Sequence, residues 1–230
     1  AAVEHLRREF SELESIDIGI SPGNRTERGL STVQAILSYC GKPLQVASAT
    51  PVFGWGGSWR HRYPAPVGAR LLSHCDVPDL ALFPAAFANG GPAPTVRFGA
   101  GLELEFLHRG MNLMAQLARI GIVANWSAHA FLLKRMADWF MHLGSDAGAM
   151  HVSVTGRSTE GTRGTRNWYL LATHGDGPYV PTLAAAALIR RLMRGDTGLV
   201  GARPCVRMLT LDEFRHEAQG LMIEMTEAFS

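Results

Sequence analysis

The stretch from Ser15 to Gly41 constrains the fold of this chain more than any other. Its first part, Ile16 to Ile20, has the apolar character of a short buried strand, and residues 21–29 form a polar turn. Residues 30–39 place apolar side chains at helical spacing, and Gly41 is a suitable stop for that helix. Many α/β proteins present ligand-facing groups on a charged loop between a strand and a helix. We therefore expect this loop to be the main candidate binding element.

The composition is that of an ordinary globular protein. Its 230 residues are 47% hydrophobic and 18% charged, which leaves enough apolar chain for a sizeable core. The net charge of +2 creates no strong field, so we expect no nucleic acid among the partners. Cys40, Cys75 and Cys205 are widely spaced and form no CxxC pair. They favour buried structural thiols, a cytoplasmic compartment and no metal site.

The beginning of the chain suggests a fragment of a longer protein. Ala1 is not a methionine, and it lies in a predicted helix over residues 1–13. Charged residues follow too early for a signal peptide. We therefore expect further sequence before Ala1.

Hydrophobic periodicity predicts roughly seven strands and six helices along the chain. Alternating residues in 150–154 and 167–173 predict an antiparallel hairpin, and residues 44–49 predict another strand. Strands occur toward both ends, with helices inserted between them. The pattern predicts an α+β fold over 1–230 as a single domain, with one mixed, largely antiparallel sheet that helices cover on one face.

Residues 102–145 predict an inserted αα-hairpin. Two apolar stripes at helical spacing occur there, but no uninterrupted apolar run is long enough to span a bilayer. In the second helix we expect Phe131, Leu132, Met136 and Trp139 on the apolar face, as core and subunit interface. A lipid-surface role of this hairpin is the less favoured alternative.

Several common catalytic and nucleotide-binding motifs are absent from the sequence. It contains no GxGxxG, GxxxxGK[ST], HExxH or GxSxG pattern. The loop after Ile20 is long and charged, whereas a dinucleotide-binding turn is tight and glycine-rich. We therefore expect no autonomous NAD-binding domain. The histidines show no ligand spacing, and His5, His108 and His216 are expected to be solvated on helix surfaces.

Asn24, Arg25 and Arg28 form the first candidate substrate-binding group. Two guanidiniums on one loop can hold a carboxylate or phosphate through bidentate hydrogen bonds, and the following helix N-terminus also favours an anion. The alternative is structural: Asn24 or Thr26 caps the helix while the arginines pair with Glu27 and Asp17.

Arg62 is the second candidate. If residues 60–63 form a strand, Arg60 and Arg62 share one face while His61 and Tyr63 share the other. At most two of the four side chains can then reach one ligand. An exposed strand with salt bridges is the alternative.

His74 and Asp176 complete the candidate set. His74 lies two residues from Asp76, and a histidine beside a carboxylate can serve as a general acid or base, although a structural hydrogen bond is the alternative. Asp176 lies between two glycines, so that a ligand could approach the backbone and hydrogen-bond to the carboxylate. A tight turn that caps the helix from Leu183 is the alternative there.

Several stretches, in order, resemble the C-terminal portion of saccharopine dehydrogenase-like oxidoreductases. They are IDIGISPGNRTERGLSTVQAILSYCGKP at 16–43, TVRFGAGLEL at 95–104, AMHVSV at 149–154 and GDGPYVPTLAAAALIRRLMRG at 175–195. The resemblance extends over nearly the whole chain. It rests on several ordered stretches and not on a catalytic signature, so no catalytic residue can be transferred from the family.

This resemblance implies a function. In such proteins an N-terminal Rossmann domain binds NAD(P), and a second domain, similar to the catalytic domain of glyceraldehyde-3-phosphate dehydrogenase, closes over the nicotinamide and mediates dimerisation. The chain would be that substrate-binding and dimerisation domain. It would orient a small-molecule substrate with Arg25, Arg28, Arg62 or Asp176, as a homodimer, and bind no cofactor alone. The large hairpin favours a bulkier, more lipid-like ligand. A non-catalytic dimerisation or small-acid-binding module is the rival interpretation.

Overall fold

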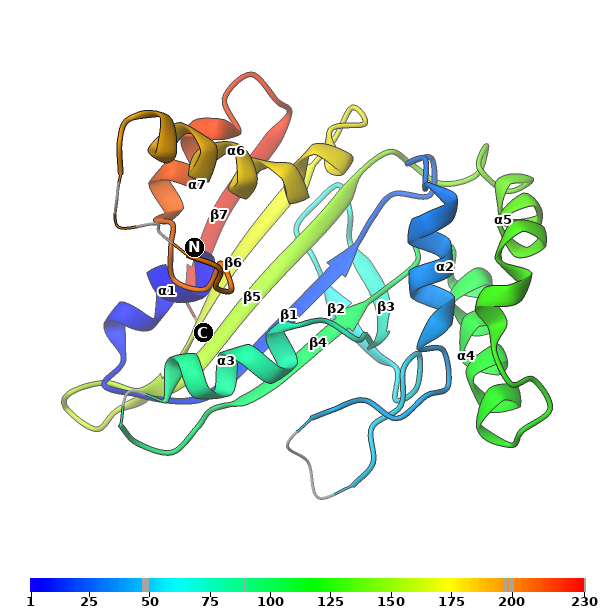
Figure 1. Cartoon of the computed structure of the whole chain (residues 1–230), viewed down its shortest axis with the longest axis horizontal. Coiled ribbons are helices and arrows are strands. Elements are labelled where there is room, and N and C mark those ends of the chain that lie inside the picture. Colours follow the sequence, from blue (N-terminus) through cyan, green and yellow to red (C-terminus); the bar gives the residue numbers. More distant parts are fainter. Residues whose placement is uncertain (47–49, 89, 197, 199–200, 230) are drawn as a thin grey trace.

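The structure is a computed structural model that describes residues 1–46, 50–88, 90–196, 198 and 201–229. Its centre is a seven-stranded sheet in the order β2-β3-β4-β1-β5-β6-β7 (Figure 1). β1 and β4 are parallel, and each other neighbouring pair is antiparallel, which confirms a mixed α+β fold. The strands are β1 (Glu12–Ser21), β2 (Trp59–Arg62), β3 (Ala69–His74), β4 (Thr95–Ala100), β5 (Gly148–Arg157), β6 (Arg163–Ala172) and β7 (Ile223–Phe229).

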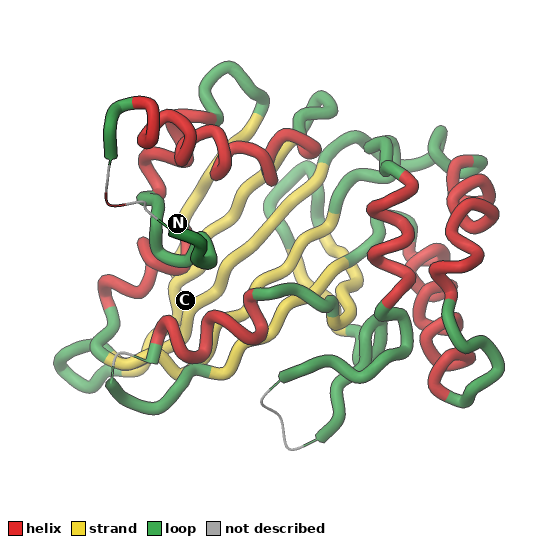
Figure 2. The backbone as a smooth tube through the Cα atoms, in the orientation of Figure 1, coloured by secondary structure: helices red, strands yellow, loops and turns green. Residues whose placement is uncertain are grey.

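The helices form two groups (Figure 2). One group packs on a single face of the sheet and consists of α1 (Ala2–Leu6), α3 (Asp79–Phe87), α6 (Val180–Met193) and α7 (Leu211–Glu217). The other lies beyond one end of the sheet and consists of α2 (Leu30–Ser38), α4 (Glu105–Arg119) and α5 (Ala130–Asp138). Short 3-10 turns occur at Arg7–Glu9, Trp126–His129 and Gly177–Tyr179.

Side-chain alternation in β1 explains why helices cover only one face. Ile16 and Ile18 are almost fully buried in the core below the helices, and burying each isoleucine contributes roughly 1.5–3 kcal/mol. The residues that alternate with them, Ser15, Asp17 and Gly19, point to the opposite face. A polar face of this kind is compatible with solvent in a largely antiparallel sheet.

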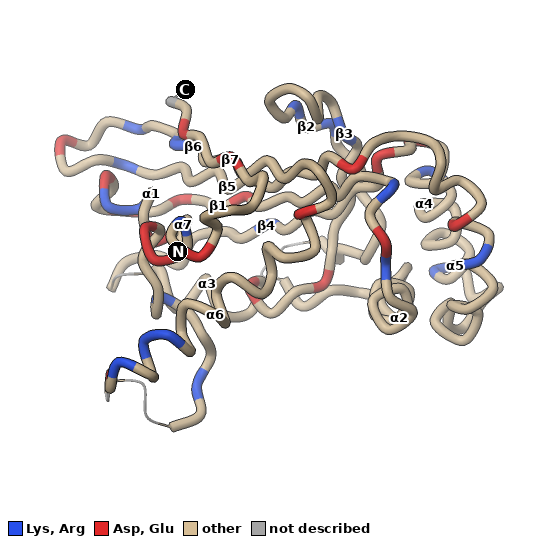
Figure 3. Tube along the Cα trace, turned by 90° about the horizontal axis from the view of Figure 1, so that it is seen from above, with Lys and Arg blue, Asp and Glu red and all other residues tan. Residues whose placement is uncertain are grey.

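The β2–β3 hairpin folds over this helix-free face. β3 pairs with β4 only at Ser73 and His74, and the hairpin then turns away and rises on the side opposite α3 and α6 (Figure 3). Two glycines in register, Gly19 and Gly99, make the close approach possible. A Cβ on Gly19 would lie 2.7 Å from Cδ1 of Leu72 in β3 and 2.3 Å from Cε1 of His151 in β5, and one on Gly99 would lie 2.5 Å from the indole of Trp59 in β2.

The helices predicted for 102–145 are present, but a self-contained hairpin is not confirmed. α5 packs on α2 and the preceding 3-10 turn, whereas α4 packs against β3. The expectation that the apolar face of the second helix belongs to the core is wrong, because Phe131 is 64% and Trp139 71% exposed, whereas its expected role as a subunit interface stays a prediction. Apolar residues do recur at helical spacing in α5, but α5 packs against α2 with another side of the helix, so the expected apolar face points outward. Within the described residues, no helix has the length and apolar character needed to cross a bilayer.

Three local expectations differ from the structure. The predicted first helix is shorter, because Leu13 already belongs to β1. Residues 44–46 form no strand, and the rest of that predicted strand, 47–49, lies outside the described residues. His108 is fully buried, not solvated, because α4 turns that side of the helix toward β3.

Candidate functional site

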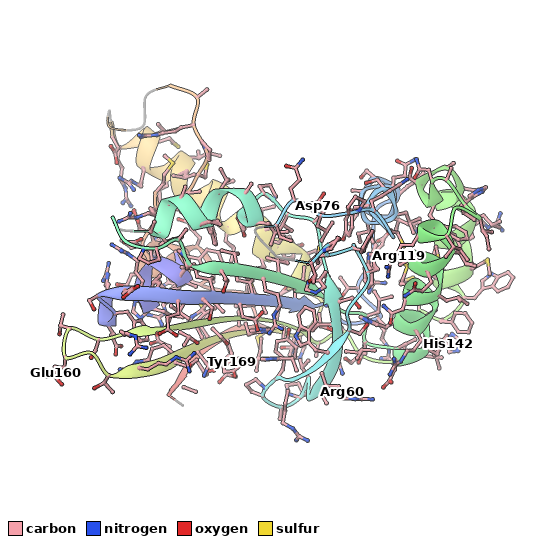
Figure 4. All side chains as sticks on the ribbon, turned by 90° about the horizontal axis from the view of Figure 1, so that it is seen from below. Arg60, Asp76, Arg119, His142, Glu160 and Tyr169 are labelled. Atoms are coloured by element: carbon pink, nitrogen blue, oxygen red, sulfur yellow. The ribbon has the colours of Figure 1, made fainter. Side chains whose placement is uncertain are left out.

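The helix-free face of the sheet carries a group of ionisable and aromatic side chains in mutual contact. Asp17 of β1 and Arg97 of β4 are opposite one another in the parallel register. Their side chains form a bidentate ion pair with distances of 2.9 and 2.5 Å. The Arg97 guanidinium also lies 4.4 Å from the centroid of the Trp59 ring, a cation–π arrangement. Figure 4 shows Tyr169 of β6 on the same face.

The protonation of Asp17 is set by these neighbours. Burial acts to raise the pKa of Asp17, but the contacts with His151 and Arg97 outweigh burial and hold the pKa below its usual range. The carboxylate is therefore ionised at neutral pH. A fixed carboxylate and a fixed, half-exposed guanidinium give this part of the face both signs of charge.

A histidine–tyrosine cluster lies beside the ion pair, under the β2–β3 hairpin. His151 of β5 is fully buried, and its Nδ1 is 3.1 Å from the hydroxyl of Tyr63. The His61 ring of β2 stacks on the His151 ring with centroids 3.6 Å apart. The Tyr169 ring centroid is 6.1 Å from that of His61.

Burial controls the titration of this cluster. It lowers the pKa of His61 to about 4, with a second contribution from the neighbouring His151. It also raises the pKa of Tyr63 and lowers that of His74. At neutral pH His61 is therefore a neutral imidazole and Tyr63 a protonated phenol, which are groups able to hold or pass a proton.

Three buried nitrogens on this face have no hydrogen-bond partner among the described residues: Nε2 of His61, Nε2 of His151 and Nε1 of Trp59. His151 Nε2 is 3.9 Å from the Asp17 carboxylate, which is too long for a hydrogen bond. Buried polar atoms in proteins are nearly always paired. The face therefore has hydrogen-bonding capacity that the described part of the chain does not satisfy.

Asn24, the first of the predicted site residues, is engaged in the fold. Its amide donates to the carbonyls of Phe140 and Leu143 at 2.7 and 3.1 Å, and its N–H donates to Glu103 at 2.6 Å. These bonds tie the β1–α2 loop to the segment after α5. The predicted helix cap is not formed, because Gly29 is the N-cap of α2 without a side-chain bond.

Arg25 and Arg28 point to different surroundings. Arg25 is exposed and donates to the carbonyl of His142 at 3.3 Å. Arg28 is half-buried, donates to the carbonyl of Gly23 at 3.4 Å, and lines a cavity between α2, α4 and α5. The expected alternative of a pair with Asp17 is wrong, because Asp17 binds Arg97.

The other three predicted residues lie apart from one another. Arg62 is exposed on the outer side of β2, and the alternation predicted for 60–63 is confirmed with His61 on the inner side. His74 lies against the Trp59 ring at 5.1 Å, at the margin of the open face. Asp176 accepts a hydrogen bond from the Met222 N–H at 2.6 Å, far along the sheet at the β6–β7 end.

The sequence reasoning missed the cluster that the fold assembles. Its members come from β1, β2, β4, β5 and β6, so no local motif joins them. The alternation in residues 60–63 was the available signal, but we favoured the cationic side of the strand over the His61 and Tyr63 side. His61 and Tyr63 were considered but not favoured, and the members that the sequence did not indicate are Asp17, Trp59, Arg97, His151 and Tyr169.

A buried serine–histidine pair lies nearby, but its geometry indicates a structural role. Ser73 Oγ and His108 Nε2 are 2.8 Å apart, and His108 Nδ1 accepts from the Leu102 N–H at 3.4 Å. Because Nδ1 is an acceptor, Nε2 carries the proton and donates to Ser73. Burial lowers the pKa of His108 to about 4. The imidazole is therefore not arranged to deprotonate the hydroxyl.

The β1–α2 loop does not fit a dinucleotide phosphate. Its peptide donors are already used: Asn24 N–H binds Glu103, and Arg25 N–H binds the Ser145 carbonyl at 2.9 Å. A phosphate cradle needs such donors free. Among the residues described, no group of three or more His, Cys, Asp or Glu is arranged to hold a metal ion.

Comparisons with known proteins bear on the fold. Neither a model of a protein family nor a curated protein sequence matches the chain. Among solved structures, the chain is similar to apo histidine-tagged saccharopine dehydrogenase (L-Glu forming) from Saccharomyces cerevisiae, with a TM-score of 0.57 and 11% identity. The match covers 99% of this chain and 70% of that one. The likeness to the glyceraldehyde-3-phosphate dehydrogenase domain stays a prediction, whereas the chain has a fold distantly similar to that of saccharopine dehydrogenase.

Proposed function

We propose that this chain is the substrate-binding domain of an NAD(P)-dependent oxidoreductase, with the cofactor held by a separate Rossmann domain of the same protein. The observation that carries the proposal is the helix-free sheet face, where Asp17, Arg97, His61 and Tyr63 gather in a fold similar to that of a dehydrogenase. The nitrogens of His61, His151 and Trp59 that lack a partner on this face favour hydrogen bonds to another domain or to a ligand.

The residues of the face suit the acceptor side of a hydride transfer. Reduced nicotinamide supplies the hydride when it is bound, and the product then requires a proton. The Tyr63 hydroxyl, linked to His151 at 3.1 Å, holds a proton at neutral pH. The half-exposed Arg97 guanidinium can orient an anionic group of the substrate while Asp17 fixes the guanidinium in place.

The test compares two proteins, this chain alone and the same chain joined to the sequence that precedes it in its gene. We expect the longer protein to bind NADPH and the chain alone not to bind it. Hydrogen–deuterium exchange then locates the contact. NADPH is expected to slow amide exchange in 59–63 and 165–169 of the longer protein while exchange in α3 stays unchanged. The absence of NADPH binding by the longer protein, or protection only at α3, would overturn the proposal.

We also propose that the full protein works as a homodimer. An uncovered sheet face can be covered by a second copy as well as by a cofactor domain. Analytical ultracentrifugation of the longer protein tests this. A monomer at micromolar concentration would contradict it and leave the oxidoreductase proposal standing.

A further inference from the structure

The apolar sides of α2, α4 and α5 enclose a cavity of about 220 Å³ at the end of the sheet (Figures 1 and 2 show the three helices). Each helix contributes residues at three- and four-residue spacing, as a single helical face requires. Ile36 and Leu37 come from α2, Leu107 and Met111 from α4, and Ala137 from α5. Apolar cavities in well-packed proteins are small and few, so an apolar space of this size is a candidate ligand site.

The charges at the cavity sum to one positive charge. Lys134 and Asp138 both line it, and they form an ion pair of 2.7 Å that neutralises both. Arg28 is the remaining charged lining residue. Within the described part of the chain it makes one long hydrogen bond, to Gly23, and no ion pair within 4 Å, although the carboxylates of Asp138 and Glu103 are near enough to act on its charge. Asp138 and Glu103 are bound to Lys134 and Arg70, so the half-buried Arg28 guanidinium has no direct carboxylate contact, and its hydrogen-bond donors at the margin of an apolar cavity favour an anionic ligand group.

We propose that this cavity binds a medium-chain monoanionic amphiphile, a fatty acid carboxylate, with its chain between the three helices and its carboxylate on Arg28. The cavity exceeds the roughly 150 Å³ apolar cavity that holds a benzene ring, and by that ratio it holds a chain of about nine carbons. The alkyl chain of the ligand can enter from the protein surface, because Met136 lines the cavity and is also exposed.

The chain offers a variant that closes the cavity without disturbing the fold. Gly110 lines the cavity on α4, and a Cβ there would meet no atom within 4 Å. Gly110→Leu therefore places a side chain in open space, and leucine favours the helix more than glycine does. Arg25 supplies the matched charge control, since it lies three residues from Arg28 on the same loop and does not line the cavity.

The experiment is calorimetric titration of the full chain with decanoate, decanol and butyrate, for the native protein and for Arg28→Gln, Arg25→Gln and Gly110→Leu. We expect decanoate to bind more tightly than decanol and butyrate. Arg28→Gln should weaken decanoate binding by about tenfold or more and leave decanol unchanged. Arg25→Gln should change neither, and Gly110→Leu should abolish both while thermal unfolding confirms that it is folded.

Three results would overturn the proposal: no decanoate binding by the native chain, equal effects of Arg28→Gln and Arg25→Gln, or undiminished binding by folded Gly110→Leu. If Gly110→Leu does not fold, Ala137→Leu takes its place, because Ala137 lines the same cavity. This binding needs no cofactor. A negative result here therefore leaves the proposed oxidoreductase function untouched, and a failure of NADPH binding by the longer protein leaves this site untouched.

Discussion

The rings of His61 and His151 stack with centroids 3.6 Å apart and planes 7° from parallel. His61 belongs to β2 and His151 to β5, and three strands separate these two in the sheet order. The stack is therefore a contact across the face of the sheet, not between neighbouring strands. It holds the β2–β3 hairpin over the polar face, and the neutral state of His61 avoids the repulsion that two imidazolium ions would have at this distance.

The first prediction is a loss of stability in mild acid. Burial lowers the pKa values of His61 and His108 to about 4, below the usual value near 6.5. Between these values the unfolded chain binds more protons than the folded one, so the free energy of unfolding falls as the pH drops from 6.5 toward 4. After allowance for the partial exposure of His61, we expect a loss of about 1–2 kcal/mol in urea unfolding between pH 6.5 and 4.5.

His61→Phe is the control for this prediction. Phenylalanine keeps a flat ring against His151 and removes one titrating group. The loss of stability over the same pH interval should become smaller in the variant. An unchanged pH dependence would mean that His61 does not titrate in this way.

The second prediction contrasts two glycines. Gly19→Ala would bring a Cβ within 2.3 Å of the His151 ring in β5 and 2.7 Å of Leu72 in the hairpin, and should destabilise the protein by about 1–3 kcal/mol, because these side chains must shift. Gly110→Ala, in an open part of helix α4, should instead stabilise the protein by up to about 1 kcal/mol. Thermal unfolding of both variants measures the difference. Equal effects of the two changes would contradict the close packing of His151 and Leu72 on Gly19.

The third prediction concerns the two neighbouring residues of the β1–α2 loop. Asn24→Ala leaves the carbonyls of Phe140 and Leu143 without their donor in a buried setting. We expect a destabilisation of about 1–3 kcal/mol in denaturant unfolding. Arg25→Ala, on the exposed side, should change stability by less than about 0.5 kcal/mol. If Asn24→Ala changed the free energy of unfolding only slightly, the structural role of Asn24 would be contradicted and a ligand-binding role would again be favoured.

Local sequence patterns predicted where helices and strands occur better than they predicted which elements pack against one another. The β1–α2 unit and the β5–β6 hairpin lie where alternation and helical spacing predicted them, because each pattern reflects burial on one side of a single element. The inner faces of α4 and α5 and the burial of His108 depend on which element packs beside them. That information is not local. The Asp17–Arg97 pair likewise exists only because β1 and β4 are parallel neighbours separated by some eighty residues.

The last prediction tests the junction that holds the candidate loop in place. Glu103 accepts hydrogen bonds from the N–H groups of Asn24 and Ser145, from the Ser145 hydroxyl and from Arg70, at 2.6 to 3.1 Å. Burial acts to raise its pKa, but the hydrogen bonds from Ser145 and Asn24 and the nearby Arg70 outweigh burial, and the carboxyl stays ionised.

Glu103→Gln turns one acceptor of this junction into a donor and leaves Arg70, only 11% exposed, without its partner. We expect a loss of about 2–4 kcal/mol in denaturant unfolding. Removing one partner of a buried ion pair leaves an uncompensated charge, which costs more stability than removing both partners. Arg70→Met combined with Glu103→Gln should therefore destabilise the protein by less than the sum of the single changes. Strict additivity in this double-mutant cycle would show that the ion pair does not couple β3 to the β1–α2 loop, and the loop would then be held by the bonds of Asn24 and Arg25 to the segment after α5.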